Sequence, residues 1–214
     1  MSVVDDLRQA VVDGQANVAV ALATKGLEGG IPAEVLLQDG LISAMQEVGR
    51  LYEEGEIFVP EMLVAARAMN ATLVVLKPLL AAEGSRVRAE GRVVIGTVQG
   101  DLHEIGKNLV AIMLEGSGFE VVNLGADVSP ERFVEAARAG VDVVAMSALL
   151  TTTMTNMKAV VEALGQAGLR EKVQVIVGGA PITATFASEI GADGYAPDAS
   201  KAVRKVRELL AVRA

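Results

Sequence analysis

The chain has 214 residues, enough for one large domain or two small ones, and its net charge of −8 argues against a nucleic-acid-binding protein, which needs a basic face. It contains no cysteine, which excludes disulfides and thiolate zinc sites. No uninterrupted apolar stretch is long enough for a bilayer, and the acidic N-terminus lacks the regions of a signal peptide, so we expect a cytoplasmic protein that binds no membrane.

The first 81 residues show helical periodicity and little strand character, and we expect residues 1–81 to form one domain, a four-helix-type bundle. A first helix is predicted over residues 5–24, or as two helices within residues 3–27. Pro32 starts a second helix that runs to about Glu54. Gly55 breaks that helix, and Pro60 opens a third over residues 61–80.

Residues 82–91 are polar and contain glycine, which is typical of a linker. After it strand and helix patterns alternate, which predicts an α/β domain over residues 92–214. Its β-branched runs are typical of a parallel sheet covered on both faces, so we expect a Rossmann-like, flavodoxin-like fold with a five-stranded, doubly wound sheet of order 2-1-3-4-5. The predicted strands are 92–98, 119–124, 141–147, 173–178 and 193–196, and the predicted helices are 105–117, 130–139, 153–167, 182–191 and 199–212.

The segment after the first predicted strand carries the only histidine of the chain, His103, two residues after Asp101. Open α/β sheets bind ligands at the carboxyl ends of their strands. An acidic residue in this position can reach the far ring nitrogen of a metal-binding imidazole. The strand order also brings the loops 101–106, 147–153 and 178–180 to one edge of the sheet, so a functional site is predicted there.

Other interpretations of this segment fit its spacing less well. A P-loop needs a serine or threonine after its lysine, whereas Asn108 follows Lys107, and the Gly-x-Gly-x-x-Gly of dinucleotide-binding proteins is absent. A receiver domain would place its phosphate-accepting aspartate close to Asp101, but the usual acidic cluster and the later strand-end lysine are not apparent. A helix-capping aspartate beside an incidental exposed histidine is the remaining alternative.

Three motifs in order carry a resemblance to a known family: Asp101-x-His103-x-x-Gly106, Ser147-x-Leu149 and Gly178-Gly179, each at the end of a predicted strand. The chain resembles, from about residue 15 to 210, the cobalamin-binding proteins of the methionine synthase and corrinoid methyltransferase type. The resemblance implies that His103 is the lower axial ligand of cobalt. It also implies that Asp101 and Thr153 form a relay behind it, with threonine in place of the family's serine.

The resemblance further implies which residues surround the cofactor, and each has an ordinary structural alternative. Ser147 and Thr151 would line the slot for the cofactor's nucleotide tail, although the threonines of this loop could each cap a helix instead. The paired glycines would let the tail pass, or form a tight turn, or both. The full set of implied cofactor-binding residues in this domain is Gly100, Asp101, Leu102, His103, Glu104, Ile105, Gly106, Ser147, Leu149, Thr151, Thr153, Gly178, Gly179, Ala180 and Ala199.

The bundle resembles the helical cap that shields the reactive face of the cobalt in this family. Four side chains would cover the methyl–cobalt bond: Tyr52, Phe58, Val59 and Met62. Aromatic and methionine side chains at helical spacing ordinarily belong to a core, which is the alternative interpretation.

The function that the resemblance implies is that of a methyl carrier. It would bind cobalamin or a related corrinoid, in its methylcobalamin state, with the cofactor's own base displaced by His103. Its partners would be a donor-specific methyltransferase, a second methyltransferase acting on an acceptor such as tetrahydrofolate or a thiol, and a reductive activation protein. With no cysteine and no second histidine to build a donor-activating zinc site, the chain is not expected to turn over alone. A cobalamin-dependent sensor module and an isomerase cobalamin subunit remain alternatives.

Overall fold

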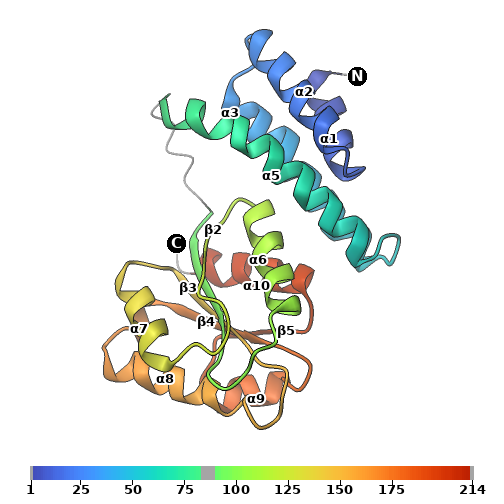
Figure 1. The fold of residues 1–214 in the computed structure, drawn as a ribbon. Coiled ribbons are helices and arrows are strands. Elements are labelled where there is room, and N and C mark those ends of the chain that lie inside the picture. Colours follow the sequence, from blue (N-terminus) through green and yellow to red (C-terminus); the bar gives the residue numbers. More distant parts are fainter. Residues whose placement is uncertain (1, 83–89, 213–214) are drawn as a thin grey trace. The chain divides into compact units, whose positions relative to one another are not determined.

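A computed structural model describes residues 2–82 and 90–212 of the chain. The chain divides into two compact units, one made of helices α1 to α5 and the other of the five strands and helices α6 to α10 (Figure 1). The predicted fold class, an α/β protein with a helical N-terminal region, is confirmed. Most of the predicted linker, residues 83–89, lies outside the described residues.

The first expected helix is two helices, α1 (Val3–Val12) and α2 (Ala16–Glu28). Ser2 and Asp5 form a reciprocal capping box at the start of α1. Gly14 separates the helices because its φ of +69° lies in the left-handed region, and a Cβ there would lie 2.7 Å from Cγ2 of Val64. Both the backbone conformation and the packing at this bend therefore require glycine.

The second expected helix is divided into α3 (Ala33–Val35), the π-helical segment η1 (Leu36–Ile42) and α4 (Ser43–Glu53). The π-helical segment contains Gly40, whose missing side chain makes room for Leu7 of α1; a Cβ there would lie 2.8 Å from Cδ2 of that leucine. Widening of the helix accompanies this close approach, which helical periodicity alone does not predict.

The long helix α5 (Val59–Ala82) starts near the expected position and contains Pro78. Within the part of the chain that the structure describes, it is the one helix long and apolar enough to cross a membrane, over Val59–Leu80. Glu61, Arg67 and Lys77 interrupt its apolar residues, and the helix packs against α2 and α4. We interpret it as the core helix of the bundle.

The strands of the second unit are β1 (Arg92–Thr97), β2 (Glu120–Asn123), β3 (Val143–Ser147), β4 (Gln174–Gly178) and β5 (Gly194–Ala196). They form one parallel sheet of order β2-β1-β3-β4-β5, which confirms the predicted order (Figure 1).

The helices of this unit are α6 (Ile105–Gly116), α7 (Pro130–Arg138), α8 (Asn156–Gln166), α9 (Ala184–Glu189) and α10 (Ala199–Ala211), with a short 3-10 helix, η2 (Arg170–Lys172), before β4. The helices α7, α8 and α9 build the core on one face of the sheet, with Phe133, Met157 and Leu164 fully buried.

Candidate functional site

The loops that follow β1, β3 and β4 meet at the carboxyl edge of the sheet. The backbone N–H of Leu149 donates to Oδ2 of Asp101 over 2.8 Å, which joins the first loop to the second. The backbone N–H of Ala148 donates to the carbonyl of Gly178 over 3.3 Å, which joins the second to the third. Three segments far apart in the sequence therefore form one site.

Asp101 is the centre of this site and is fully buried. Its Oδ1 accepts from the backbone N–H and from the ring Nδ1 of His103, over 3.0 and 2.7 Å. Its Oδ2 accepts from the hydroxyl of Thr153 over 2.7 Å and from the N–H groups of Leu149 and Leu150 over 2.8 and 3.3 Å. One oxygen therefore serves the histidine and the other serves the loop after β3.

These donors keep the carboxyl group ionised. Burial by itself raises the pKa of Asp101, but hydrogen bonds from the Thr153 hydroxyl, from the backbone of His103 and Leu149, and from the His103 ring outweigh it. The pKa of Asp101 therefore lies well below its usual range.

The imidazole of His103 is oriented by this carboxylate but remains open to solvent. Because an ionised carboxylate only accepts, ring Nδ1 must carry the proton that it shares with Asp101. The lone pair of a neutral ring is then on Nε2, and the His103 side chain is 51% exposed. An imidazole whose far nitrogen is fixed by a carboxylate is the arrangement that proteins use to present a metal ligand.

Thr153 lies in a turn before α8, not at its N-cap. The N-cap residue of α8 is Thr155, whose side chain makes no capping bond, so the alternative in which Thr151, Thr152 or Thr153 caps this helix is wrong. The buried Thr153 hydroxyl lies 2.7 Å from Asp101 and 3.1 Å from the carbonyl of Leu150. Its single proton favours the closer, charged acceptor.

Exchanging Asp101 for asparagine should destabilise the protein although the shape of the side chain is kept. All five groups around the carboxylate are donors, so an amide NH2 would face donors on one side or the other. We expect the free energy of unfolding in urea to fall by about 2 kcal/mol. Asp198→Asn, at the N-cap of α10, is the matched control and should change it by less than about 0.5 kcal/mol, because asparagine caps as well as aspartate. Equal losses in the two variants would contradict this account of Asp101.

Large exposed apolar side chains lie next to His103 in the sequence and on the loop that is hydrogen-bonded to Asp101. Leu102 is 76% exposed and Ile105 is 90% exposed, while Leu149 and Leu150 are each more than 40% exposed. A Cβ added to Gly106 would meet nothing within 4 Å, so this side of the α6 start is open. Exposed apolar residues grouped around one polar group indicate a ligand surface. A broad, mainly apolar ring system with an atom that accepts a nitrogen ligand fits it.

The remaining predicted residues of this unit lie along the same edge, with different exposure. Thr151 and Ala180 are exposed, Ser147 and Gly178 are half-buried, and Ala199, at the start of α10, is buried. The side chain of Glu104 contacts Lys107. Gly179 has a structural reason to be glycine, since its φ is +128° and a Cβ would lie 1.9 Å from the carbonyl oxygen of Ala148. The tight-turn interpretation therefore holds for it, and passage of a cofactor tail stays a prediction.

The four predicted cap residues belong to the helical unit and differ in exposure. Phe58 is 66% exposed, Tyr52 and Val59 are partly exposed, and Met62 is fully buried. Phe58 thus has a surface available to a ligand in this conformation, whereas Met62 is a core residue of the kind that the alternative interpretation describes. Shielding by these four residues stays a prediction.

Sequence reasoning missed several residues that support the site. The buried hydroxyl of Thr97 donates to the backbone carbonyl of His103. Buried Lys107 donates to Glu104 over 2.8 Å and to Asn123 over 2.6 Å. Exposed Asp127, at a φ of 53°, accepts from the N–H of Gly100. Thr97 and Lys107 could have been noticed in the sequence, because one is a hydroxyl residue within an apolar strand and the other a lysine on an apolar helix.

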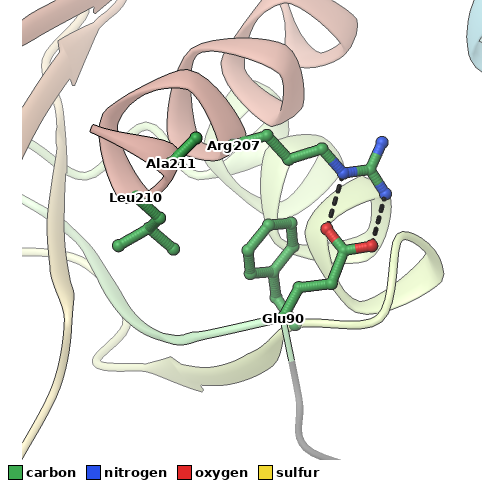
Figure 2. A pocket seen from close by; sticks show the side chains of 5 residues that line it. Glu90, Arg207, Leu210 and Ala211 are labelled. Atoms are coloured by element: carbon green, nitrogen blue, oxygen red, sulfur yellow. Dashed lines mark hydrogen bonds and ion pairs between the residues drawn. The ribbon is translucent and has the colours of Figure 1, made fainter. Parts of the chain in front are cut away.

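A pocket of about 270 Å³ lies elsewhere in this unit, lined by Glu90, Phe119, Arg207, Leu210 and Ala211 (Figure 2). Arg207 donates to both carboxylate oxygens of Glu90 and lies over the Phe119 ring. Glu90 and Phe119 precede β1 and β2, so the pocket is at the amino end of the parallel strands. It is therefore separate from the site around His103.

Comparison with known proteins shows the family to which the chain belongs. The B12 binding domain family matches residues 91–204, more than half of the chain, and a second family described as a B12 binding domain matches residues 3–77. The chain is 39% identical over 212 residues to a corrinoid protein of Desulfitobacterium hafniense, covering 98% of each. It is 44% identical over 204 residues to trimethylamine corrinoid protein 1 of Methanosarcina acetivorans, covering 95% of this chain and 94% of that one.

Solved structures show the same relationship. The methanol:cobalamin methyltransferase complex MtaBC of Methanosarcina barkeri contains a chain that matches with a TM-score of 0.88 at 30% identity, covering 98% of this chain and 80% of that one. A cobalamin-binding protein of Desulfitobacterium hafniense matches with a TM-score of 0.79, also at 30% identity, covering 96% and 98%. The fold and the family matches together define a cobalamin-binding α/β protein. More narrowly, the chain belongs to the B12-binding corrinoid proteins of methyltransferase systems.

Proposed function

We propose that the chain is a methyl carrier that binds its corrinoid with the cofactor's own base displaced and with His103 on the cobalt. The observation that carries this proposal is the exposed imidazole whose Nδ1 is fixed by a buried, ionised aspartate. The open apolar surface of Leu102 and Ile105 beside it fits a corrin ring. Names of nearly full-length relatives, such as trimethylamine and dimethylamine corrinoid proteins, favour this function over a sensor module or an isomerase subunit.

The residues divide the work of holding the cofactor. His103 would bind cobalt through Nε2, and Asp101 would keep the proton on Nδ1 and so maintain a good nitrogen ligand. Leu102 and Ile105 would exclude water below the ring, and the hydroxyls of Ser147 and Thr151 would bind polar groups of the tail. When bound, the corrinoid supplies a cobalt atom that accepts a methyl group from a donor and gives it to a nucleophile.

Three partners follow from this proposal. A donor-specific methyltransferase would supply the methyl group, and a second methyltransferase would pass it to an acceptor such as tetrahydrofolate or a thiol. A reductive activation protein would reduce cofactor that has become oxidised, so that it can accept a methyl group again. The names of the relatives support a methylated amine as the donor, and that of the solved complex supports methanol. A cytoplasmic location is part of the same proposal.

The proposal predicts that the purified, cobalamin-loaded chain is inert alone. Reduced protein should show no methylation from trimethylamine, dimethylamine, methanol or a methoxyarene, measured by the visible absorbance of its cobalt. Adding the matching donor methyltransferase should start methylation with one of these donors. Reaction with methyl iodide serves as the control for a competent cofactor. Steady methylation without a partner protein, or none with any donor and its methyltransferase, would refute the carrier function.

A further inference from the structure

We propose that Thr97 is a positioning residue for His103: its buried hydroxyl fixes the backbone of the histidine and thereby the direction in which the ring presents Nε2. The inference rests on the proposed role of His103 as a cobalt ligand. It extends the hydrogen-bonded set of His103, Asp101 and Thr153 by a residue of the sheet itself.

Thr97 ends β1 and is fully buried, although the strand before it is apolar. Its Oγ1 donates to the backbone carbonyl of His103 over 3.0 Å. A buried hydroxyl is unfavourable unless it finds a partner, so this hydrogen bond explains how a polar side chain is accommodated at the end of the strand.

The bond completes a hold on both ends of the His103 peptide backbone. The N–H of His103 donates to Asp101 over 3.0 Å, its carbonyl accepts from Thr97, and its ring Nδ1 is tied to Asp101 over 2.7 Å. Without Thr97, both of these hydrogen bonds of His103 would go to a single side chain, that of Asp101. Thr97 supplies the third anchor from a different element, which limits rotation of the backbone that carries the ring.

Thr97 is itself held rigidly. Its backbone N–H donates to the carbonyl of Gly125 over 2.9 Å, its carbonyl accepts from Val128 over 3.0 Å, and it pairs with Ser147 of the neighbouring strand. The carbonyl of His103 is therefore anchored to the carboxyl end of β1, a strand with neighbours on both sides.

Packing cannot replace this anchor. The segment from Asp101 to Glu104 belongs to no helix or strand, and the neighbouring Leu102 is 76% exposed. Leu102 and the His103 ring pack little, and the buried Asp101 is itself held by hydrogen bonds, so hydrogen bonds order the loop. Removing one of them should therefore act on the orientation of His103 before it acts on the fold.

The test compares Thr97→Val, which keeps the shape but removes the donor, with Thr97→Ser, which keeps the donor. Thr72→Val is the matched control: Thr72 is also fully buried and also donates to a backbone carbonyl, that of Ala68 over 2.9 Å, but within α5. Urea unfolding of the full-length variants establishes that each is folded.

The first measurement needs no cofactor. Because the chain has a single histidine, 15N-histidine labelling gives one backbone amide signal and one pair of ring nitrogens. Thr97→Val should shift and broaden the His103 amide signal, Thr97→Ser should keep it near its wild-type position, and Thr72→Val should leave it unchanged.

The second measurement uses the cobalamin-loaded chain in its paramagnetic Co(II) state. In this state, electron paramagnetic resonance shows whether the histidine nitrogen is bound to the cobalt. Thr97→Val should lower the ratio of cobalt with a histidine ligand to cobalt without one about fivefold, which corresponds to the loss of one ordinary hydrogen bond. Thr97→Ser should restore the wild-type ratio. Unchanged signals in Thr97→Val, or equal changes in Thr72→Val, would overturn the positioning role. Lack of histidine coordination in the wild type would instead refute the ligand role of His103, while the cofactor-free measurement would still decide whether Thr97 orders this residue.

Discussion

Exchanging His103 for alanine should abolish coordination of the bound cobalt by a histidine nitrogen and weaken corrinoid binding about 100-fold or more, while the fold is retained. The fold should survive because Asp101 keeps four donors, namely the backbone N–H groups of residues 103, 149 and 150 and the Thr153 hydroxyl. We expect the free energy of unfolding without cofactor to change by about 1 kcal/mol or less.

The single histidine makes this assignment unusually direct. In the wild-type Co(II) protein, 15N labelling of histidine alone should change the nitrogen hyperfine splitting of the paramagnetic resonance spectrum from three lines to two. In His103→Ala the splitting should vanish, and added free imidazole should restore it by binding in place of the ring. A splitting that ignores the histidine label, or a variant with wild-type affinity and spectrum, would eliminate His103 as the ligand.

Gly179→Ala should have the largest effect on stability of any substitution considered, lowering the free energy of unfolding by about 4 kcal/mol. Two costs add at this position. The φ of +128° is one that side chains rarely adopt, and the new Cβ would lie 1.9 Å from the carbonyl oxygen of Ala148, a backbone atom that cannot turn aside. The loops after β3 and β4 would have to separate, so corrinoid binding should be lost as well.

Gly165→Ala in α8 is the matched control. A Cβ there meets nothing within 4 Å, and the residue lies inside a regular helix, so alanine should be neutral or stabilise by about 0.5–1 kcal/mol. Urea unfolding with far-ultraviolet circular dichroism measures both variants. A loss below about 1 kcal/mol in Gly179→Ala would show that the two loops can part easily and that the close approach is not a constraint.

The sheet and the position of the site could be predicted from the sequence because both depend on regular patterns. Alternation of β-branched runs with helices predicted a flavodoxin-like strand order, which the structure has, and the rule that ligands bind at strand ends pointed to the loop of His103. The pairing of Asp101 with His103 followed from their spacing and from the family resemblance. None of this required knowledge of side-chain packing.

What could not be predicted depends on contacts between distant residues. The π-helical segment η1 accompanies the packing of Leu7 against Gly40. Helix α8 starts at Asn156, not at residue 153, and the Thr153 hydroxyl donates to Asp101 from the turn before it. In the same way, the hydroxyl of Thr97 stands out in an apolar strand, but its partner, the His103 carbonyl, is known only from the structure.

The two oxygens of Asp101 have separate partners, and this affects whether the His103 ring can move without disturbing the loops around it. Only the ring bond to Oδ1 is lost if the imidazole swings away, because the backbone N–H of His103 and every donor to Oδ2 stay in place. The scaffold that joins β1 to the loop after β3 is thus independent of the moving part. If the His103 ring leaves the cobalt and binds it again, the hydrogen bonds that hold its backbone and the neighbouring loop are still formed, so its return requires no refolding of the loop.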